Sequence, residues 1–153
     1  MEEEEAADLK ELMEHEPDSA GGIMTSGYVA VSAALSAAEV PAELRDLAAE
    51  VPAENSFTIF LIDPDESLRG VTNLRDVLVA PSDTPVADIM NANPAVAHVG
   101  DDVMEAARLV ARYDLFALPV LDDGQLVGII TVDDALDVLL PPEWKEYFPR
   151  EKH

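Results

Sequence analysis

Two stretches of the chain share one design: Gly70-Val71-Thr72-Asn73-Leu74-Arg75-Asp76 and Gly128-Ile129-Ile130-Thr131-Val132-Asp133-Asp134. In each, β-branched residues follow a glycine, a residue suited to helix capping comes next, and an aspartate stands six positions after the glycine. β-branched runs favour strands, and Asn and Thr are common helix N-caps. Each stretch is therefore predicted to be a strand that runs directly into a helix, with Asn73 and Thr131 at the caps.

The sequence around these stretches is duplicated. Each half has an Ile-Met pair, a short apolar run, a helix-like stretch, a longer apolar run, an acidic turn, and the strand and helix described above. In the first half these elements are Ile23-Met24, 29–31, 44–51, 57–62, 63–66 and 68–79. In the second half they are Ile89-Met90, 96–99, 103–110, 116–121, 122–124 and 126–140.

This order predicts an α/β (α+β) domain of two βαββα halves. Each half, at about 60 residues, is small for a stable core, so the halves are expected to pack face to face. The first half is longer, and its extra residues are expected near Pro41 and Pro52. Residues 80–85, with two prolines, are expected to link the halves. A short acidic helix is predicted before Pro17.

Composition limits the classes of partner. The chain has 153 residues, 48% of them hydrophobic, no cysteine, and a formal net charge of −23 at pH 7. The hydrophobic content is sufficient for a packed core, and the missing cysteines exclude disulfides and thiolate metal sites. The charge disfavours nucleic acids and anionic membrane surfaces, and favours cations or a basic protein. No stretch is long and apolar enough for a membrane helix, so no insertion of this chain into a membrane is expected.

The remaining motifs predict no enzyme activity. The sequence has no glycine-rich phosphate loop, no nucleophile–base pairing and no metalloprotease helix. The three histidines, His15, His98 and His153, lack the spacing of zinc ligands, and His98 is predicted to lie in a strand. Asp122-Asp123-Gly124 is interpreted as a hairpin turn.

The two strand–helix stretches resemble the CBS motif, and their tandem resembles a CBS pair over residues 22–140. The resemblance implies pseudo-two-fold symmetry and a homodimer formed through helix faces. It divides the chain into an acidic helix and junction (1–21), a first CBS unit (22–80), a second CBS unit (81–140) and an aromatic tail (141–153).

The CBS resemblance also implies an adenosine nucleotide, ATP or AMP, as a possible ligand. The residues that match its nucleotide contacts are Thr72, Asn73, Arg75 and Asp76 in the first unit, and Thr131 and Asp134 in the second. Asn73 departs from the usual Ser or Thr, and Thr58 and Leu115 stand where the related transporters described next have aromatic residues that stack on the base. The alternative is that both motifs only cap their helices.

A narrower resemblance links residues 17–25, 112–120 and 131–139 to MgtE-family magnesium transporters. It implies a cytoplasmic regulatory module that senses Mg²⁺ and gates a membrane pore domain. In that family, backbone oxygens at the positions of Gly22 and Ala111 face Mg²⁺, and carboxylates stand at the positions of Asp114, Asp134 and Asp137. Oxygen ligands of this kind suit Mg²⁺.

The sequence differs from this family in two respects, and two other functions are also considered. Pro141-Pro142 should end the last helix where the family continues it, and most of the family's N-terminal domain has no counterpart in this sequence. The alternative functions are an adenosine-nucleotide sensor for another effector and a ligand-free dimerisation module.

Overall fold

The computed structural model describes residues 17–113 and 115–144. The predicted acidic helix, Asp114 and most of the aromatic tail fall on residues 1–16, 114 and 145–153, which lie outside the described residues.

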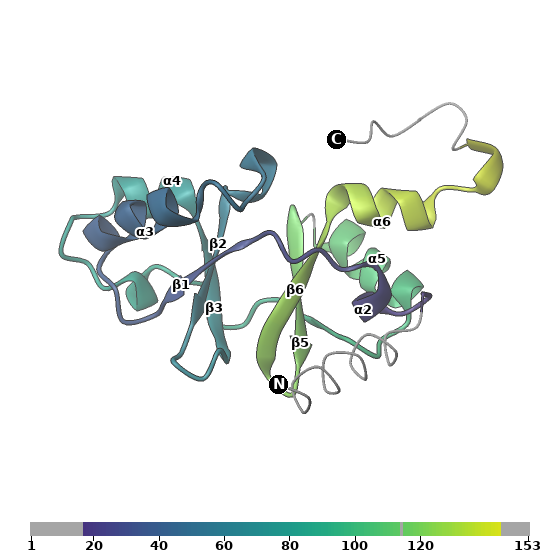
Figure 1. Cartoon of the computed structure of the whole chain (residues 1–153), viewed down its shortest axis with the longest axis horizontal. Helices are drawn as coiled ribbons and strands as arrows, with labels where there is room; N and C mark the ends of the chain where they lie inside the picture. The colour runs from purple at the N-terminus through teal and green to yellow at the C-terminus, as the bar shows by residue number, and fades with distance from the viewer. Residues whose placement is uncertain (1–16, 114, 145–153) are drawn as a thin grey trace, which may run out of the picture.

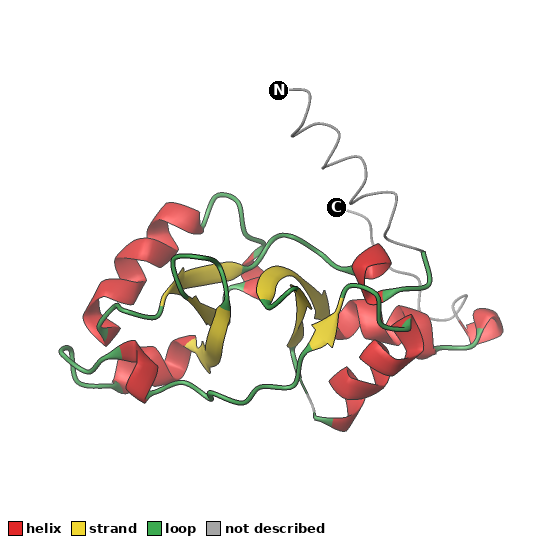
Figure 2. Cartoon of the chain, turned by 90° about the horizontal axis from the view of Figure 1, so that it is seen from below, coloured by secondary structure: helices red, strands yellow, loops and turns green. Residues whose placement is uncertain are grey.

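The chain folds into two halves of the same design, with the two sheets in the middle and helices on the outer flanks (Figures 1 and 2). The first half contains β1 (Val29–Ser32), α3 (Val40–Leu47), β2 (Thr58–Ile62), β3 (Leu68–Asn73) and α4 (Leu74–Val79). The second contains β4 (Ala97–His98), α5 (Val103–Arg112), β5 (Ala117–Asp122), β6 (Gln125–Thr131) and α6 (Val132–Leu139). Each sheet has three strands, with the first parallel to the second and the second antiparallel to the third. The predicted fold class and duplication are confirmed.

The strand–helix stretches also form as predicted. β3 passes directly into α4, and β6 passes directly into α6. α6 ends at Leu139, just before the two prolines, and a short 3₁₀ turn follows at Pro142–Trp144. The hairpin between β5 and β6 turns through Asp123 and Gly124, whose φ angles of 53° and 82° are typical of a two-residue turn.

The helix of the first half starts and ends earlier than predicted. The apolar spacing placed it over 44–51, but α3 runs from Val40 to Leu47. Ser36 and Glu39 form a capping box at a preceding 3₁₀ turn, and Pro41 occupies the first turn of α3, where it has no hydrogen bond to lose. Val51 is buried but lies outside α3. Its spacing from Leu44 and Leu47 therefore came from its place in the core and not from a continuous helix.

The segment that leads into each half packs on the other half. Thr25 exchanges two backbone hydrogen bonds with Ile129 of β6, with N···O distances of 2.8 and 2.9 Å. Asn91 makes the same exchange with Val71 of β3, at 2.8 and 3.0 Å. We call residues 17–25 and 81–91 the exchanged arms.

Each arm completes the other half's core. The first arm carries α2 (Ala20–Ile23), and Ala20 is fully buried in the core cluster of α5, β5 and β6. The second arm buries Val86 in the core of β1, β2 and α3. Each packed unit therefore consists of one half and the arm that leads into the other half.

A methionine of each arm covers a glycine of the strand that it crosses. A β-carbon added at Gly128 would lie 2.6 Å from Met24 Sδ, and one at Gly70 would lie 2.5 Å from Met90 Sδ. At Gly70 the Asn91 carbonyl oxygen, a backbone atom, would also be only 2.7 Å away. The glycine of each motif thus leaves room for the arm.

A smaller apolar cluster joins the two sheets. Phe60 of β2 packs with Leu126 and Ile129 of β6, and Tyr28 borders this cluster. The Tyr28 hydroxyl donates to the Leu126 carbonyl at 3.3 Å, and its ring meets Phe60 edge to face at 5.9 Å. Burial, assisted by the Glu66 carboxylate, raises the pKa of Tyr28, so the hydroxyl remains a donor at neutral pH.

Within the part of the chain that the structure describes, no helix combines the length and the apolar character needed to span a bilayer.

Gly70→Ala is expected to lower the free energy of unfolding by about 1–3 kcal/mol, because the added methyl meets a backbone oxygen that cannot move alone. Gly128→Ala should cost less, since the Met24 side chain can shift. Gly100→Ala, where nothing lies within 4 Å of the new β-carbon, is the control. Urea unfolding measures all three, and a loss for Gly70→Ala no larger than that of the control would contradict the role of the arms.

Candidate functional site

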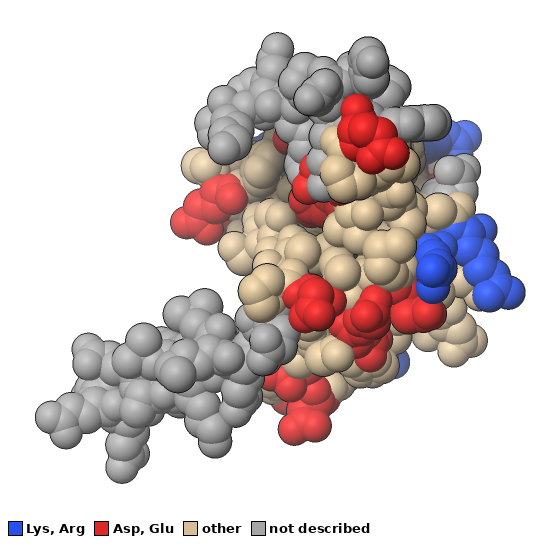
Figure 3. Space-filling view, turned by 90° about the vertical axis from the view of Figure 1, so that its right-hand side faces the viewer, with Lys and Arg blue, Asp and Glu red and all other residues tan. Residues whose placement is uncertain are grey.

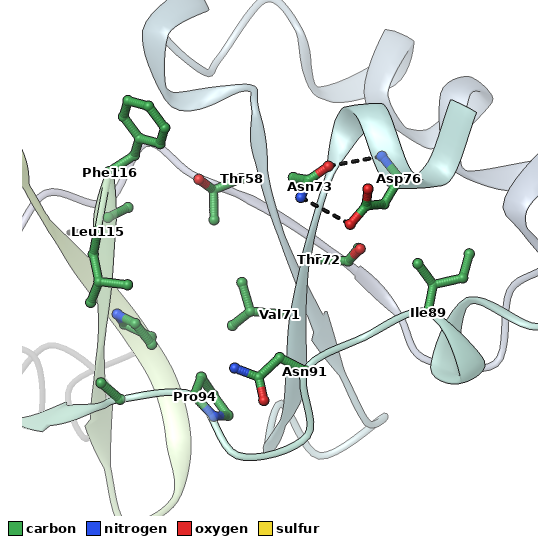
Figure 4. A pocket seen from close by; sticks show the side chains of 13 residues that line it. Thr58, Val71, Thr72, Asn73, Asp76, Ile89, Asn91, Pro94, Leu115 and Phe116 are labelled. Atoms are coloured by element: carbon green, nitrogen blue, oxygen red, sulfur yellow. Dashed lines mark hydrogen bonds between the residues drawn. The ribbon is translucent and has the colours of Figure 1, made fainter. Parts of the chain in front are cut away.

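One cleft lies at the motif of each half, where the exchanged arms cross. The first, of about 310 Å³, is bounded by the β3–α4 junction, the second arm and the start of β5 (Figure 4). The residues that line it are Thr58, Val71, Thr72, Asn73, Asp76, Ile89, Asn91, Pro94, Ala95, Leu115, Phe116, Ala117 and Pro119. The second, of about 260 Å³, is bounded by the β6–α6 junction and the first arm. The residues that line it are Thr25, Pro52, Glu54, Asn55, Phe116, Thr131, Val132, Asp133 and Asp134.

The polar end of the first cleft is fixed by a helix cap. Asn73 Oδ1 accepts from the Asp76 backbone N–H at 2.8 Å, and Asn73 Nδ2 donates to Asp76 Oδ2 at 3.1 Å. Figure 4 shows this pair of bonds at the edge of the cleft. Arg75 Nη1 lies 3.5 Å from Asp76 Oδ1 and its side chain is 81% exposed. The predicted cap is confirmed, and it holds the Asp76 carboxylate at the cleft.

Thr72 presents a buried hydroxyl that the fold does not use. The residue is 6% exposed, and its Oγ1 is the one buried side-chain oxygen or nitrogen among the described residues without a hydrogen-bond partner. An unpaired buried hydroxyl costs stability. Its counterpart in the second half is Ile130, which is fully buried and apolar, so this position of the fold does not require a hydroxyl. The unused hydroxyl therefore points to a ligand of the first cleft.

The opposite end of the first cleft is apolar. Leu115 and Phe116 lie on the β5 side, across the cleft from Thr72, Asn73 and Asp76 (Figure 4). Thr58 and Leu115 both line this cleft, although neither is aromatic. The cleft can therefore accept a molecule with a planar apolar part at one end and hydroxyl groups at the other.

The second cleft has a different charge. Thr131 and Asp134 form a capping box in which Thr131 Oγ1 donates to Asp134 Oδ2 at 2.9 Å and Thr131 N donates to the same oxygen at 3.2 Å. Glu54 and Asp133 also line this cleft, so it has three carboxylates where the first has one. The predicted cap is confirmed, and the structure separates the six nucleotide candidates: Thr72, Asn73 and Asp76 line the first cleft, Arg75 lies beside it, and Thr131 and Asp134 line the second.

The metal candidates that the structure describes lie on helices that pack in the second half. Gly22 is on α2 of the first arm, Ala111 is on α5, and both are exposed. Asp134 and Asp137 are half-buried and one turn apart on α6, while Asp114 is outside the described residues. Figure 3 shows acidic side chains spread over the end of the molecule that these helices form. No three acidic or histidine side chains among residues 17–113 and 115–144 are grouped so that they could hold a metal ion.

Sequence reasoning missed the residues that the arms and the segment just before β5 contribute to the clefts. Asn91 reaches the first cleft because its arm crosses β3, and Phe116 lines both clefts. The repeated Ile-Met pair was the available signal for the arms, but a repeat does not tell which half each copy packs against.

Comparison with known proteins agrees with this geometry. The CBS domain family model matches residues 86–141. The magnesium transporter MgtE of Thermus thermophilus is 46% identical over 134 residues, covering 87% of this chain and 29% of the transporter. A CBS domain-containing protein of Dictyostelium discoideum is 33% identical over 98 residues, covering 52% of this chain and 67% of that protein.

A solved structure extends the comparison to three dimensions. The cytosolic domain of the Mg²⁺ channel MgtE in complex with ATP has a TM-score of 0.78 and 43% identity, covering 87% of this chain and 53% of that one. The chain thus spans under a third of the transporter's length and about half of the solved domain. It belongs to the CBS-domain family, as a tandem pair similar to the cytosolic part of MgtE magnesium transporters.

Proposed function

We propose that this chain is the regulatory, non-catalytic CBS pair of a magnesium transporter, located on the cytosolic side and coupled to a membrane pore domain. The 46% identity to MgtE over 87% of the chain carries this proposal.

The regulatory ligand in this proposal is Mg²⁺. Asp134 and Asp137 lie one turn apart on α6, so their carboxylates can share one hydrated ion. Mg²⁺ keeps several of its waters and needs few protein ligands, so two carboxylates can suffice although no three acidic or histidine side chains of the described residues are placed to hold a metal ion. Backbone oxygens at Gly22 and Ala111, and the Asp114 carboxylate, are the further proposed ligands.

The proposed response follows from charge. The chain has 32 acidic and 9 basic residues, so at low Mg²⁺ its carboxylates repel one another and loosen the contacts with a second copy or a neighbouring domain. At high Mg²⁺, bridging ions favour the closed arrangement of a homodimer, and the pore shuts.

The first arm is hydrogen-bonded to the half that carries the proposed Mg²⁺ ligands Asp134 and Asp137. The Ala20 and Gly21 N–H groups donate to the Asp101 and Val99 carbonyls at 2.8 and 2.9 Å, and the Val103 N–H donates to the Asp18 carbonyl at 2.8 Å. The first arm is therefore anchored to the half that contains Asp134 and Asp137, so the arm moves together with that half.

Mg²⁺ binding predicts a stabilisation that other salts do not give. MgCl₂ should raise the melting temperature of the chain above its value in NaCl of equal ionic strength, because an ion that binds the folded state stabilises it. Asp137→Asn should remove most of this difference. Asp88→Asn, which loses the same charge at an exposed site of the second arm, should retain it. Equal melting temperatures of the unmodified chain in the two salts would overturn the Mg²⁺ proposal.

A second ligand is favoured by the first cleft. We propose that it binds an adenosine nucleotide, ATP or AMP, with the ribose near Thr72, Asn73 and Asp76. The unused Thr72 hydroxyl supports this proposal, and the similar MgtE domain was solved in complex with ATP. Arg75 extends into solvent beside Asp76, where its guanidinium can reach a phosphate.

Thr72→Val tests the nucleotide proposal because it separates stability from binding. The free variant should unfold with a free energy equal to or about 1 kcal/mol above that of the unmodified chain, since an unpaired hydroxyl is removed without loss of volume. Its affinity for ATP and AMP, measured by calorimetry, should fall. Thr84→Val, at a half-buried position outside both clefts, should leave affinity unchanged. Failure of the unmodified chain to bind either nucleotide would overturn the nucleotide proposal, and failure to bind Mg²⁺ as well would favour a ligand-free dimerisation module.

A further inference from the structure

Phe116 is a large apolar residue that is exposed and lines both clefts. It is 77% exposed. Among the described residues, it is the one aromatic residue that lines the first cleft, and it is also the one that lines the second. Its backbone is fixed, because the Phe116 carbonyl accepts from the Val132 N–H at 3.1 Å at the start of α6. The residue is thus anchored through its backbone while its ring stays uncovered.

The duplication supplies an internal reference for this residue. Phe57 occupies the equivalent place before β2, and its carbonyl accepts from the Leu74 N–H at 2.9 Å at the start of α4. Phe57 is 60% exposed, but it is not among the residues that line either cleft. The two phenylalanines therefore share their backbone environment and differ in whether the ring borders a cleft.

An aromatic ring at the rim of a cleft suits a flat ligand group. Stacking of a nucleobase on an aromatic side chain contributes to binding whichever base is present, because every base has a π-face. Phe116 and Leu115 lie across the first cleft from Thr72, Asn73 and Asp76, so a base can lie at one end while a ribose reaches the other (Figure 4).

We infer that Phe116 is the base-stacking residue of the first cleft. This inference rests on the nucleotide binding proposed above and assigns the residue that recognises the base. Among the residues that line the first cleft, Phe116 is the one with an aromatic ring, so it supplies the stacking surface. The second cleft shares the same ring, but its three carboxylates repel a phosphate, so the ring serves a nucleotide in the first cleft.

Four single-residue variants test this assignment by calorimetric titration with AMP and with ATP. Phe116→Ala should weaken binding roughly tenfold or more, the loss typical of one stacked base. Phe116→Tyr should bind as the unmodified chain does, whereas Phe116→Leu, which is apolar but not planar, should remain weak. Phe57→Ala should bind normally. Melting temperatures without ligand show whether each variant is folded, and the exposure of both rings predicts small changes.

The possible outcomes separate the two levels of the proposal. If the unmodified chain binds neither nucleotide, the nucleotide site itself is overturned and Phe116 has no base to stack. If the unmodified chain binds and Phe116→Ala binds equally well, the site stands and the role of Phe116 is overturned. Restoration of binding by Phe116→Leu to the level of Phe116→Tyr would also overturn stacking, because an apolar cover would then be sufficient.

Discussion

The exchange of arms between the two halves is the constraint on which the rest of the structure depends. Each arm supplies a buried residue to the opposite core, Ala20 in one direction and Val86 in the other, and each bonds to the third strand of that half. If an arm left its place, it would expose apolar core and leave backbone groups unpaired. The two small halves therefore stabilise each other, and Gly70 and Gly128 leave the room that Met90 and Met24 of the arms occupy.

The same crossings form the clefts. Asn91 and Val71, which exchange backbone hydrogen bonds, both line the first cleft, and Thr25 of the first arm lines the second. A ligand in either cleft would therefore contact an arm of one half and the motif of the other. Binding would strengthen the contact that already holds the halves together, so a ligand-dependent change in stability is a direct consequence of where the clefts lie.

The local parts of this arrangement could be read from the sequence, because they depend on neighbouring residues. Capping by Asn73 and Thr131, the stop before Pro141 and the Asp123–Gly124 turn each follow from the conformational preferences of a few residues. The non-local parts could not. Which half each arm packs against depends on the whole core, and so does the burial of Val51 outside α3. The role of Phe116 was hidden for the same reason, since its position relative to both clefts exists only after the halves pack.

Comparison of the two halves separates what the fold requires from what a ligand requires. A residue at the same position in both halves, such as the glycine under each methionine, is explained by packing alone. Thr72 and Ile130 share a position and a strand register but differ in polarity, and only the apolar one is satisfied by its surroundings. Likewise, one carboxylate lines the first cleft and three line the second, although the backbone of the two motifs is alike. Because the fold has already fixed the backbone, these differences are the part of the sequence that is available for binding. They favour a hydroxyl-bearing ligand in the first cleft and disfavour an anion in the second.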